Sequence, residues 1–390
     1  MAITIDQEPY TLLNLSGNPI EFTFSSDQTG QANFSFYIEV YAGGVLVTTK
    51  DAYVENGDSG KINISDVAEN YTSPPTLGTS LTGSDAQNYE YFSIKVYERY
   101  GDPASLQASA TSSNIWAIKG KKEYLDWVNF SGIDYIYPVT NDTPFLTDKP
   151  NVAVIEDGET EYLFLMFDQV GYSYFVSVEY YDIDGTQLDN FIDFSPDDSR
   201  CVCYAINKTN LEAAYAGVVS WDEVTSIKFQ ISDIALPNNR TEIRTITFST
   251  EYSGDKTRVE FLSQFGGIDS YTFTRRNKKN ISTNADMYMP IKGEWDGTDY
   301  SYSGAIVEAV NFAVSGQKSI ELSSNWINEE FLEYLLNNLF LSPLVRIQIG
   351  SAMVRVGNGN NSAYYSKNKY DQLFNIVWQI SLGRHTSMSI

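Results

Sequence analysis

Apolar and polar residues alternate along much of the first 118 positions. PIEFTFSS, from Pro19, alternates in this way, and so does NFSFYIEVYAGGVLVTTK, from Asn33. A period of two residues is typical of half-buried strands, and Gly43–Gly44 predicts a tight hairpin turn within the second segment. YFSIKVYERY, from Tyr91, predicts a third strand, whereas residues 72–88 show no periodicity and are predicted to be a long loop. We therefore expect a first β-sandwich domain over residues 1–118.

The same kind of pattern continues over residues 119–252, after a change of composition at the segment IKGKK. Residues 161–167, EYLFLMF, are almost continuously apolar, which favours a strand that is buried on both faces. Residues 173–194 predict a hairpin with Asp184–Gly185 as its turn, and two further strands follow from Thr225 and Arg244. These features predict a second β-sandwich domain.

Residues 253–390 combine several predicted strands with one helix over residues 328–340. Asn328 is the expected N-cap, acidic residues follow it in the first turn, and Pro343 comes just after the predicted end. Leucines recur at positions 332, 335, 336 and 339, the spacing of one helical face. The sequence thus predicts a mainly β protein of tandem antiparallel sandwich or barrel domains, with one notable helix in the C-terminal domain.

Composition narrows the possible functions. The chain holds 26 Lys and Arg against 50 Asp and Glu, a formal net charge of −24, which disfavours binding to nucleic acid. No segment is apolar enough to insert into a membrane, and the N-terminal residues do not resemble a secretory signal. Cys201 and Cys203, the only cysteines, are expected on one face of a strand as free thiols, so we expect synthesis in a reducing cytoplasm.

Two copies of one motif raise the question of a repeated site. FSGID occupies residues 130–134 and FGGID residues 265–269. Neither copy matches a phosphate-binding glycine motif, so we interpret both as structural turns. The prediction places Gly132 and Gly267 in turns and has Asp134 and Asp269 bond backbone groups or a neighbouring chain.

Candidate chemistry elsewhere is sparse, and we expect neither an enzyme nor a bound cofactor. Asp182, Asp184 and Asp189 form a weak calcium candidate, but their spacing departs from an EF-hand and favours a hairpin turn. His385 is the only histidine and lies in an apparently frayed tail, which disfavours a nucleophilic triad. Six tryptophans could stack on sugars, although most lie in predicted strands where core packing is the commoner use.

Four blocks of sequence follow one another in a fixed order along the chain. The N-terminal block carries Asn18–Pro19–Ile20, Ser25–Ser26, Asn33–Phe34 and Val40–Tyr41. The other three blocks are FLTDKP at 145–150 followed by YLFLMF, FLSQFGGIDSYTFT at 261–274, and residues 324–347 around the predicted helix. Together these blocks resemble structural proteins in the tails of phages that infect Bacteroidetes, including crAss-like phages.

The resemblance implies a hub, baseplate or ring component of a phage virion, made in the bacterial cytoplasm. Its expected partners are further copies of itself, in a cyclic homo-oligomer, and other tail proteins. A tail adhesin that binds host surface glycans is the alternative, and a glycan-degrading tail enzyme with paired carboxylates is a weaker one.

Overall fold

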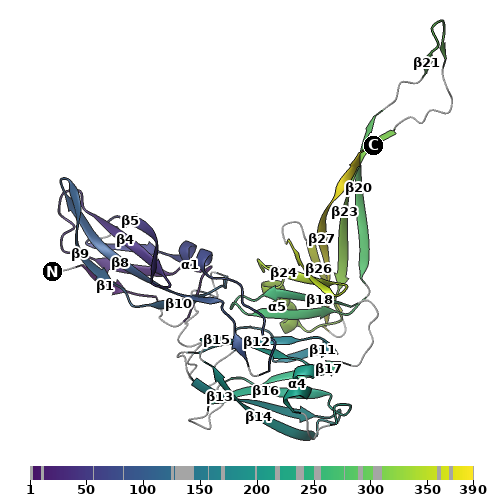
Figure 1. Cartoon of the computed structure of the whole chain (residues 1–390), viewed down its shortest axis with the longest axis horizontal. Coiled ribbons are helices and arrows are strands. Elements are labelled where there is room, and N and C mark those ends of the chain that lie inside the picture. The colour runs from purple at the N-terminus through teal and green to yellow at the C-terminus, as the bar shows by residue number, and fades with distance from the viewer. Residues whose placement is uncertain are drawn as a thin grey trace. The chain divides into compact units, whose positions relative to one another are not determined.

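The computed structural model shows a mainly β chain (Figure 1). The described residues are 3–9, 13–55, 57–81, 83–123, 127, 145–156, 158–167, 172–197, 200–215, 220–233, 241–249, 256–275, 277–288, 293–301, 310–357, 362–368 and 372–389. The chain divides into two compact units: residues 1–251, 260–270 and 334–342 form the first, and residues 252–259, 271–333 and 343–390 the second.

A first β-sandwich is built from the N-terminal residues. One sheet has the order β1-β3-β6, and the other has the order β2-β10-β8-β4-β5 with β9 also paired to β8. Both sheets contribute side chains to one apolar core. The elements are β1 (Thr4–Gln7), β2 (Asn14–Leu15), β3 (Glu21–Ser25), β4 (Ser35–Ala42), β5 (Val45–Ala52), β6 (Ser59–Asn63), α1 (Ser65–Tyr71), β8 (Tyr89–Gly101), β9 (Ala104–Thr111) and β10 (Ile115–Ile118).

The predicted alternation explains how this core forms. Phe36, Ile38 and Val40 on β4 are buried, and the residues between them are only partly so. Gly43 and Gly44 both have positive φ, 59° and 77°, and join β4 to β5. Two consecutive positive φ values match the twist of a hairpin and suit glycine, so the predicted turn is confirmed.

A second β-sandwich follows within the same unit. Its larger sheet has the order β11-β17-β16-β13-β14 and its smaller sheet the order β12-β15-β7. The elements are β11 (Val152–Glu156), β12 (Glu161–Met166), β13 (Tyr172–Tyr181), β14 (Gln187–Asp197), β15 (Cys201–Ile206), α4 (Lys208–Ala214), β16 (Ser226–Asp233), β17 (Arg244–Ser249) and, from earlier in the chain, β7 (Ser84–Asp85).

The two sandwiches repeat one order of elements. Apart from β1, β7 and β9, each has two strands before a hairpin, and a strand, a short helix and two sheet strands after it. In each, the first strand of the larger sheet pairs in parallel with the last: β2 with β10, and β11 with β17. These parallel pairs depart from the predicted antiparallel arrangement, which holds for the other described ladders. The repeated architecture covers residues 14–118 and 152–249, and both the FSGID and the FGGID motif lie outside these ranges.

The segment predicted to be a long loop, residues 72–88, contains a strand. β7 pairs antiparallel with β15 of the second sandwich, and Leu81 is buried in that sandwich's core. The prediction failed here because β7 is only two residues long and shows no period. The second sandwich therefore contains residues from within the sequence of the first.

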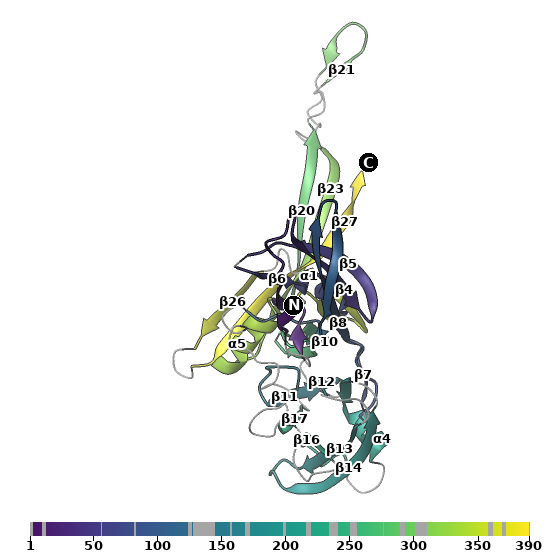
Figure 2. The ribbon, with the colours of Figure 1, turned by 90° about the vertical axis from the view of Figure 1, so that its left-hand side faces the viewer.

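The remaining strands form three sheets. Their orders are β19-β18-β24-β25, β20-β23-β27-β26 and β21-β22. Figure 2 shows β20, β23 and β27 as long strands that run alongside one another. The elements are β18 (Thr257–Leu262), β19 (Ile268–Phe273), β20 (Lys278–Tyr288), β21 (Glu294–Trp295), β22 (Tyr300–Ser301), β23 (Val310–Ser323), α5 (Glu329–Asn338), β24 (Val345–Ile349), β25 (Ala352–Val356), β26 (Ser362–Lys367) and β27 (Phe374–Ser389).

The predicted helix is confirmed as α5, which is two residues shorter than expected at its C-terminal end. Asn328 caps it, since the Asn328 side-chain oxygen accepts a hydrogen bond of 2.9 Å from the Phe331 N–H. Leu332, Leu335 and Leu339 are buried, as the leucine spacing predicts, whereas Leu336 is only half-buried.

The boundaries of the predicted domains, 1–118, 119–252 and 253–390, stay predictions. The described compact units divide the chain differently, because residues 260–270 and 334–342 group with residues 1–251. Short range alternation in a sequence carries no information about such groupings, which depend on contacts between distant segments.

Candidate functional site

The FGGID motif lies at the connection between β18 and β19. Its positive φ, 84°, falls at Gly266, and the Ser263 N–H donates a hydrogen bond of 2.8 Å to the Gly267 carbonyl. Gly267 itself has no positive φ and is needed for packing instead, since a Cβ there would lie 2.6 Å from the Leu146 carbonyl oxygen. Gly132 and Asp134, in the other copy, lie outside the described residues.

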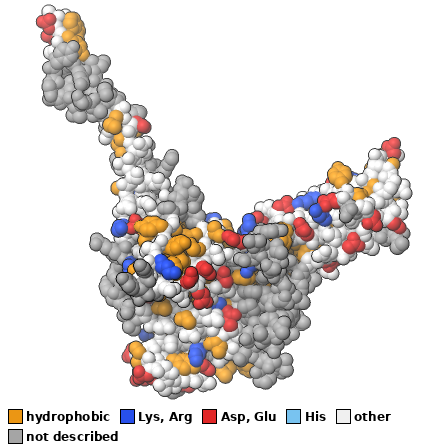
Figure 3. All heavy atoms as spheres, turned by 180° about the vertical axis from the view of Figure 1, so that it is seen from behind, with side chains coloured by type: hydrophobic (Ala, Val, Ile, Leu, Met, Phe, Trp, Pro, Cys, Tyr) orange, Lys and Arg blue, Asp and Glu red, His pale blue; other side chains and the backbone are white. Residues whose placement is uncertain are grey.

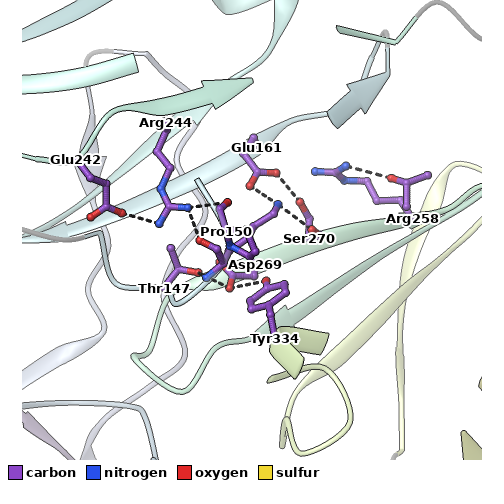
Figure 4. A network of polar contacts seen from close by, with 11 residues as sticks. Thr147, Pro150, Glu161, Glu242, Arg244, Arg258, Asp269, Ser270 and Tyr334 are labelled. Carbon is purple, nitrogen blue, oxygen red and sulfur yellow. Dashed lines mark hydrogen bonds and ion pairs between the residues drawn. The ribbon is translucent and has the colours of Figure 1, made fainter. Parts of the chain in front are cut away.

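The described hydrogen bonds of Asp269 come from side chains of its own chain, whereas the prediction named backbone groups or a neighbouring chain. Its side chain is buried, and its Oδ2 accepts hydrogen bonds from the Thr147 hydroxyl, at 2.6 Å, and the Tyr334 hydroxyl, at 2.7 Å. Figure 4 shows these two hydroxyl groups converging on the carboxylate. A buried carboxylate takes donors from any segment that packs against it, and the donors of Asp269 lie far away in sequence, where local reasoning does not find them.

A buried ion pair adjoins Asp269. Lys149 Nζ donates to Glu161 Oε1 and, at 3.0 Å, to the Ser270 carbonyl, and the Ser270 hydroxyl donates to Glu161 Oε2 at 2.9 Å. The Lys149 and Glu161 side chains are 5% and 3% exposed. Each charge thus has its opposite partner and further hydrogen bonds, the condition under which a buried ion pair is tolerated.

Arg244 extends this arrangement along the start of β11. Its guanidinium donates to the carbonyls of Lys149 and Pro150, and it forms an ion pair with Glu242 at 2.6 Å (Figure 4). The arginine therefore fixes the backbone that presents the buried lysine. We call Thr147, Lys149, Glu161, Arg244, Asp269, Ser270 and Tyr334 the polar clasp.

Burial sets the protonation behaviour of the clasp. It raises the pKa of Asp269 to about 6, because loss of hydration outweighs the attraction of Lys149 and the two donated hydrogen bonds. Burial and the neighbouring Asp269 carboxylate raise the pKa of Tyr334 well above its ordinary value. Asp269 is therefore a carboxyl group of the clasp that changes charge near pH 6.

The clasp joins three of the four sequence blocks described above. Thr147 and Lys149 belong to 145–150, Asp269 and Ser270 to 261–274, and Tyr334 to 324–347. Around it, the Ser263 hydroxyl donates to the Leu146 carbonyl at 3.0 Å, and Asn338 accepts from the Gln264 N–H at 2.9 Å. The sequence blocks therefore meet at one buried place.

Sequence reasoning named Asp269 but missed its partners. The available signals were a lysine between apolar and proline residues in FLTDKP and a glutamate that opens the apolar run EYLFLMF. β12 is buried on both faces, as predicted: Leu163 and Leu165 face the sandwich core, while Phe164 lies close to Gly267. A charge next to a doubly buried strand indicates a buried ion pair, although not the identity of its partner.

The calcium candidate does not assemble into a metal site. Asp182 Oδ1 accepts hydrogen bonds from the N–H groups of Asp184 and Thr186, at 3.0 and 2.7 Å, within the β13–β14 turn. Asp189 lies on β14 and accepts a hydrogen bond of 2.7 Å from the Tyr215 hydroxyl. Among the described residues, no three Asp, Glu, His or Cys side chains form a group that could hold a metal ion.

The two cysteines, the histidine and two of the tryptophans named in the sequence lie in strands. Cys201 and Cys203 are buried free thiols on β15, and burial raises the pKa of Cys203 to about 12. His385 belongs to β27, so the expectation of a frayed tail was wrong. Trp378 is fully buried, whereas Trp295 on β21 is exposed. Within the described part of the chain, no helix has both the length and the apolar character needed to span a membrane.

Comparisons with known proteins give only distant similarities. No protein-family model and no curated protein matches the chain. The calcium-binding domain CBD12 of CALX1.1 is 11% identical, with 60% of this chain and 79% of that chain covered and a TM-score of 0.21. The Dpr2 Ig1-Ig2 complex with DIP-Theta Ig1-Ig3 is 7% identical, with 99% and 91% covered and a TM-score of 0.20. Chicken CNTN1 FN1-FN3 is also 7% identical, with 82% and 91% covered and a TM-score of 0.20. At these TM-scores the similarities support no inference about function.

Proposed function

We propose that the chain is a structural component of a bacteriophage tail, of the hub, baseplate or ring type, that self-assembles and docks other virion proteins. The observation that carries the proposal is the polar clasp. Three blocks that resemble tail proteins supply five of its seven residues, Thr147, Lys149, Asp269, Ser270 and Tyr334, to one buried hydrogen-bonded network. The shared sequence therefore serves the packing of the chain. Such a network fixes how distant segments pack, a property that a repeated building block needs.

The charge of the chain agrees with a protein that binds proteins. Acidic side chains recur over the face shown in Figure 3, as expected for a net charge of −24. Repulsion from phosphate makes direct contact with packaged DNA unfavourable. A position in the tail is compatible with this charge.

The proposal is tested on purified particles of the phage that encodes the chain. Quantitative mass spectrometry should find the chain in virions at a fixed copy number relative to the other tail proteins, and gold-labelled antibody should mark the tail. A protein confined to the soluble fraction of infected cells would contradict the proposal. A matched antibody against a known capsid protein controls for labelling of broken particles.

A glycan-binding tail adhesin is the second candidate, favoured by one observation. Trp295 and Tyr300 are paired across β21 and β22, and they are 64% and 41% exposed. Adjacent exposed aromatic rings can stack on sugars. At least one glycan from a panel of host surface glycans should then bind the purified natural chain and fail to bind the Trp295→Ala variant. Equal binding by both proteins would remove this candidate.

A further inference from the structure

The sheet β20-β23-β27-β26 is covered over only part of its length. Ile320 and Leu322 on β23 are buried, and so are the residues opposite them on β27, Ile380 and Trp378. β26 pairs with β27 only at residues 374–379. Beyond that point β20, β23 and β27 continue as a three-stranded ribbon, visible in Figure 2.

The face that is buried at Ile320 continues along the ribbon, where its described side chains are exposed or only half-buried. Alternation places Gly316 and Val314 on the same face as Ile320, and the register pairs them with Thr283 and Ala285 of β20. Ile281 and Met287, which share this face of β20, are 61% and 65% exposed. We call Lys279, Ile281, Thr283, Ala285, Met287, Val314, Gly316 and Lys318 the ribbon face.

The opposite side of the ribbon is polar. Its described residues on β20 are Lys278, Asn280, Ser282, Asn284 and Asp286, and Ala313, Ser315, Gln317, Ser319 and Glu321 accompany them on β23. A strand with one apolar and one polar side is typical of a sheet whose apolar side is covered. A ribbon without a core is also marginally stable by itself, so burial of the ribbon face would stabilise it.

The charges on the ribbon indicate what covers it. Among the described side chains of β20 and β23, the ribbon face carries Lys279 and Lys318 and no acidic group. The other side carries Asp286 and an ion pair between Lys278 and Glu321. A partially apolar face with two positive charges and no described acidic group fits an acidic protein surface. The chain itself, with a net charge of −24, offers such a surface.

We propose that the ribbon face binds the acidic surface of a second copy of this chain. This inference rests on the self-assembly included in the proposed function and assigns that assembly to one face. Ribbon and acidic surface are different parts of the chain, so the contact is head-to-tail, and repeating it closes a ring when the rotation between copies allows closure.

The first experiment measures association of the full chain by mass photometry and sedimentation velocity. Ile281→Asp and Met287→Asp each place a charge at the centre of the proposed contact, and we expect each to raise the midpoint concentration of assembly about tenfold or more. Ser282→Asp, on the polar side of the same strand, is the matched control and should stay within about twofold of the natural protein. Circular dichroism and thermal unfolding verify that all three variants are folded.

A second experiment reverses the charge. Lys279→Glu combined with Lys318→Glu should weaken assembly, and added salt should weaken assembly of the natural chain more than that of this variant, because screening removes an attraction only where one exists. The variant Ile281→Cys, cross-linked through its thiol within the assembly, should join to a residue near acidic side chains of the neighbouring copy.

The outcomes separate this inference from the proposed function. If the chain assembles and the Ile281 and Met287 variants assemble equally well, the ribbon face is not the interface, and a tail function is untouched. If the natural chain stays monomeric but Ile281→Asp abolishes binding to another virion protein, a second copy is the wrong occupant. If the ribbon variants lose assembly and the chain is missing from virions, the interface stands and the tail function falls.

Discussion

The two sandwiches share an order of elements, but they differ in how their smaller sheets are completed. The first takes β1 from its own N-terminal residues, so its core draws only on residues 3–117. The second takes β7 and Leu81 from the sequence between α1 and β8, and its strand β12 begins at the polar clasp. Two sandwiches with the same order of elements therefore differ in how far each depends on the rest of the chain, because the second has buried partners from three separate parts of it.

The strongest test of this difference removes one charge of the clasp. Lys149→Met leaves Glu161 buried without its partner, and we expect the stability of the second sandwich to fall by about 3–5 kcal/mol. Hydrogen exchange with mass spectrometry should show faster exchange in β12 and β15 and little change in β4 and β8 of the first sandwich.

Its control is the double variant Lys149→Met with Glu161→Leu, which removes both charges. An apolar pair of similar volume should recover most of the lost stability. If the single and double variants are equally unstable, the loss comes from packing and not from an unpaired charge. Equal loss in both sandwiches would show that they unfold as one cooperative unit.

A second test uses the residue that the second sandwich takes from earlier in the chain. Leu81→Ala opens a cavity in the second core and should cost about 2–4 kcal/mol. Leu46→Ala, at an exposed position of β5, is the control and should change stability by less than about 0.5 kcal/mol. Urea unfolding gives both values. Hydrogen exchange of Leu81→Ala gives the location of the change. Faster exchange in the first sandwich instead of the second would contradict the assignment of Leu81 to the second core.

The smallest effect concerns pH and Asp269. Its folded pKa of about 6 is raised above the ordinary carboxyl value, so the folded state binds a proton more tightly than the unfolded state. Stability contributed by this proton is fully present below about pH 4 and is lost as pH rises to about 6. The natural chain should therefore lose up to about 3 kcal/mol over this window relative to Asp269→Asn, which cannot titrate.

The measurement is urea unfolding of both proteins at pH 4, 5, 6 and 7. Only the difference between them is interpreted, because the many other carboxyl groups titrate in both. Tyr334→Phe serves as the control, since it removes one hydrogen bond to Asp269 and leaves the carboxyl in place. A constant difference between the natural chain and Asp269→Asn across the window would show that this carboxyl has no raised pKa.

Local sequence patterns predicted much of the fold and little of the clasp. Alternation identified β4, β8 and the β13–β14 hairpin, and the Asn328 cap identified α5, because these features depend on neighbouring residues. β7 escaped, since two residues cannot display a period, and the parallel β2–β10 and β11–β17 pairs escaped because pairing between distant strands leaves no local signature. Asp269 was noticed as a turn residue, but its donors Thr147 and Tyr334 lie 122 and 65 residues away.

The reach of the clasp along the chain has a consequence during translation. The first sandwich has its residues available once about 120 amino acids have left the ribosome. The second has its own strands by residue 249, but Glu161 and Lys149 lack Ser270 until that residue emerges, and Asp269 lacks the Tyr334 hydroxyl for longer still. A nascent chain that is stalled before Ser270 and Tyr334 have emerged lacks hydrogen-bond partners for Lys149, Glu161 and Asp269. In that interval it is most accessible to proteases and chaperones.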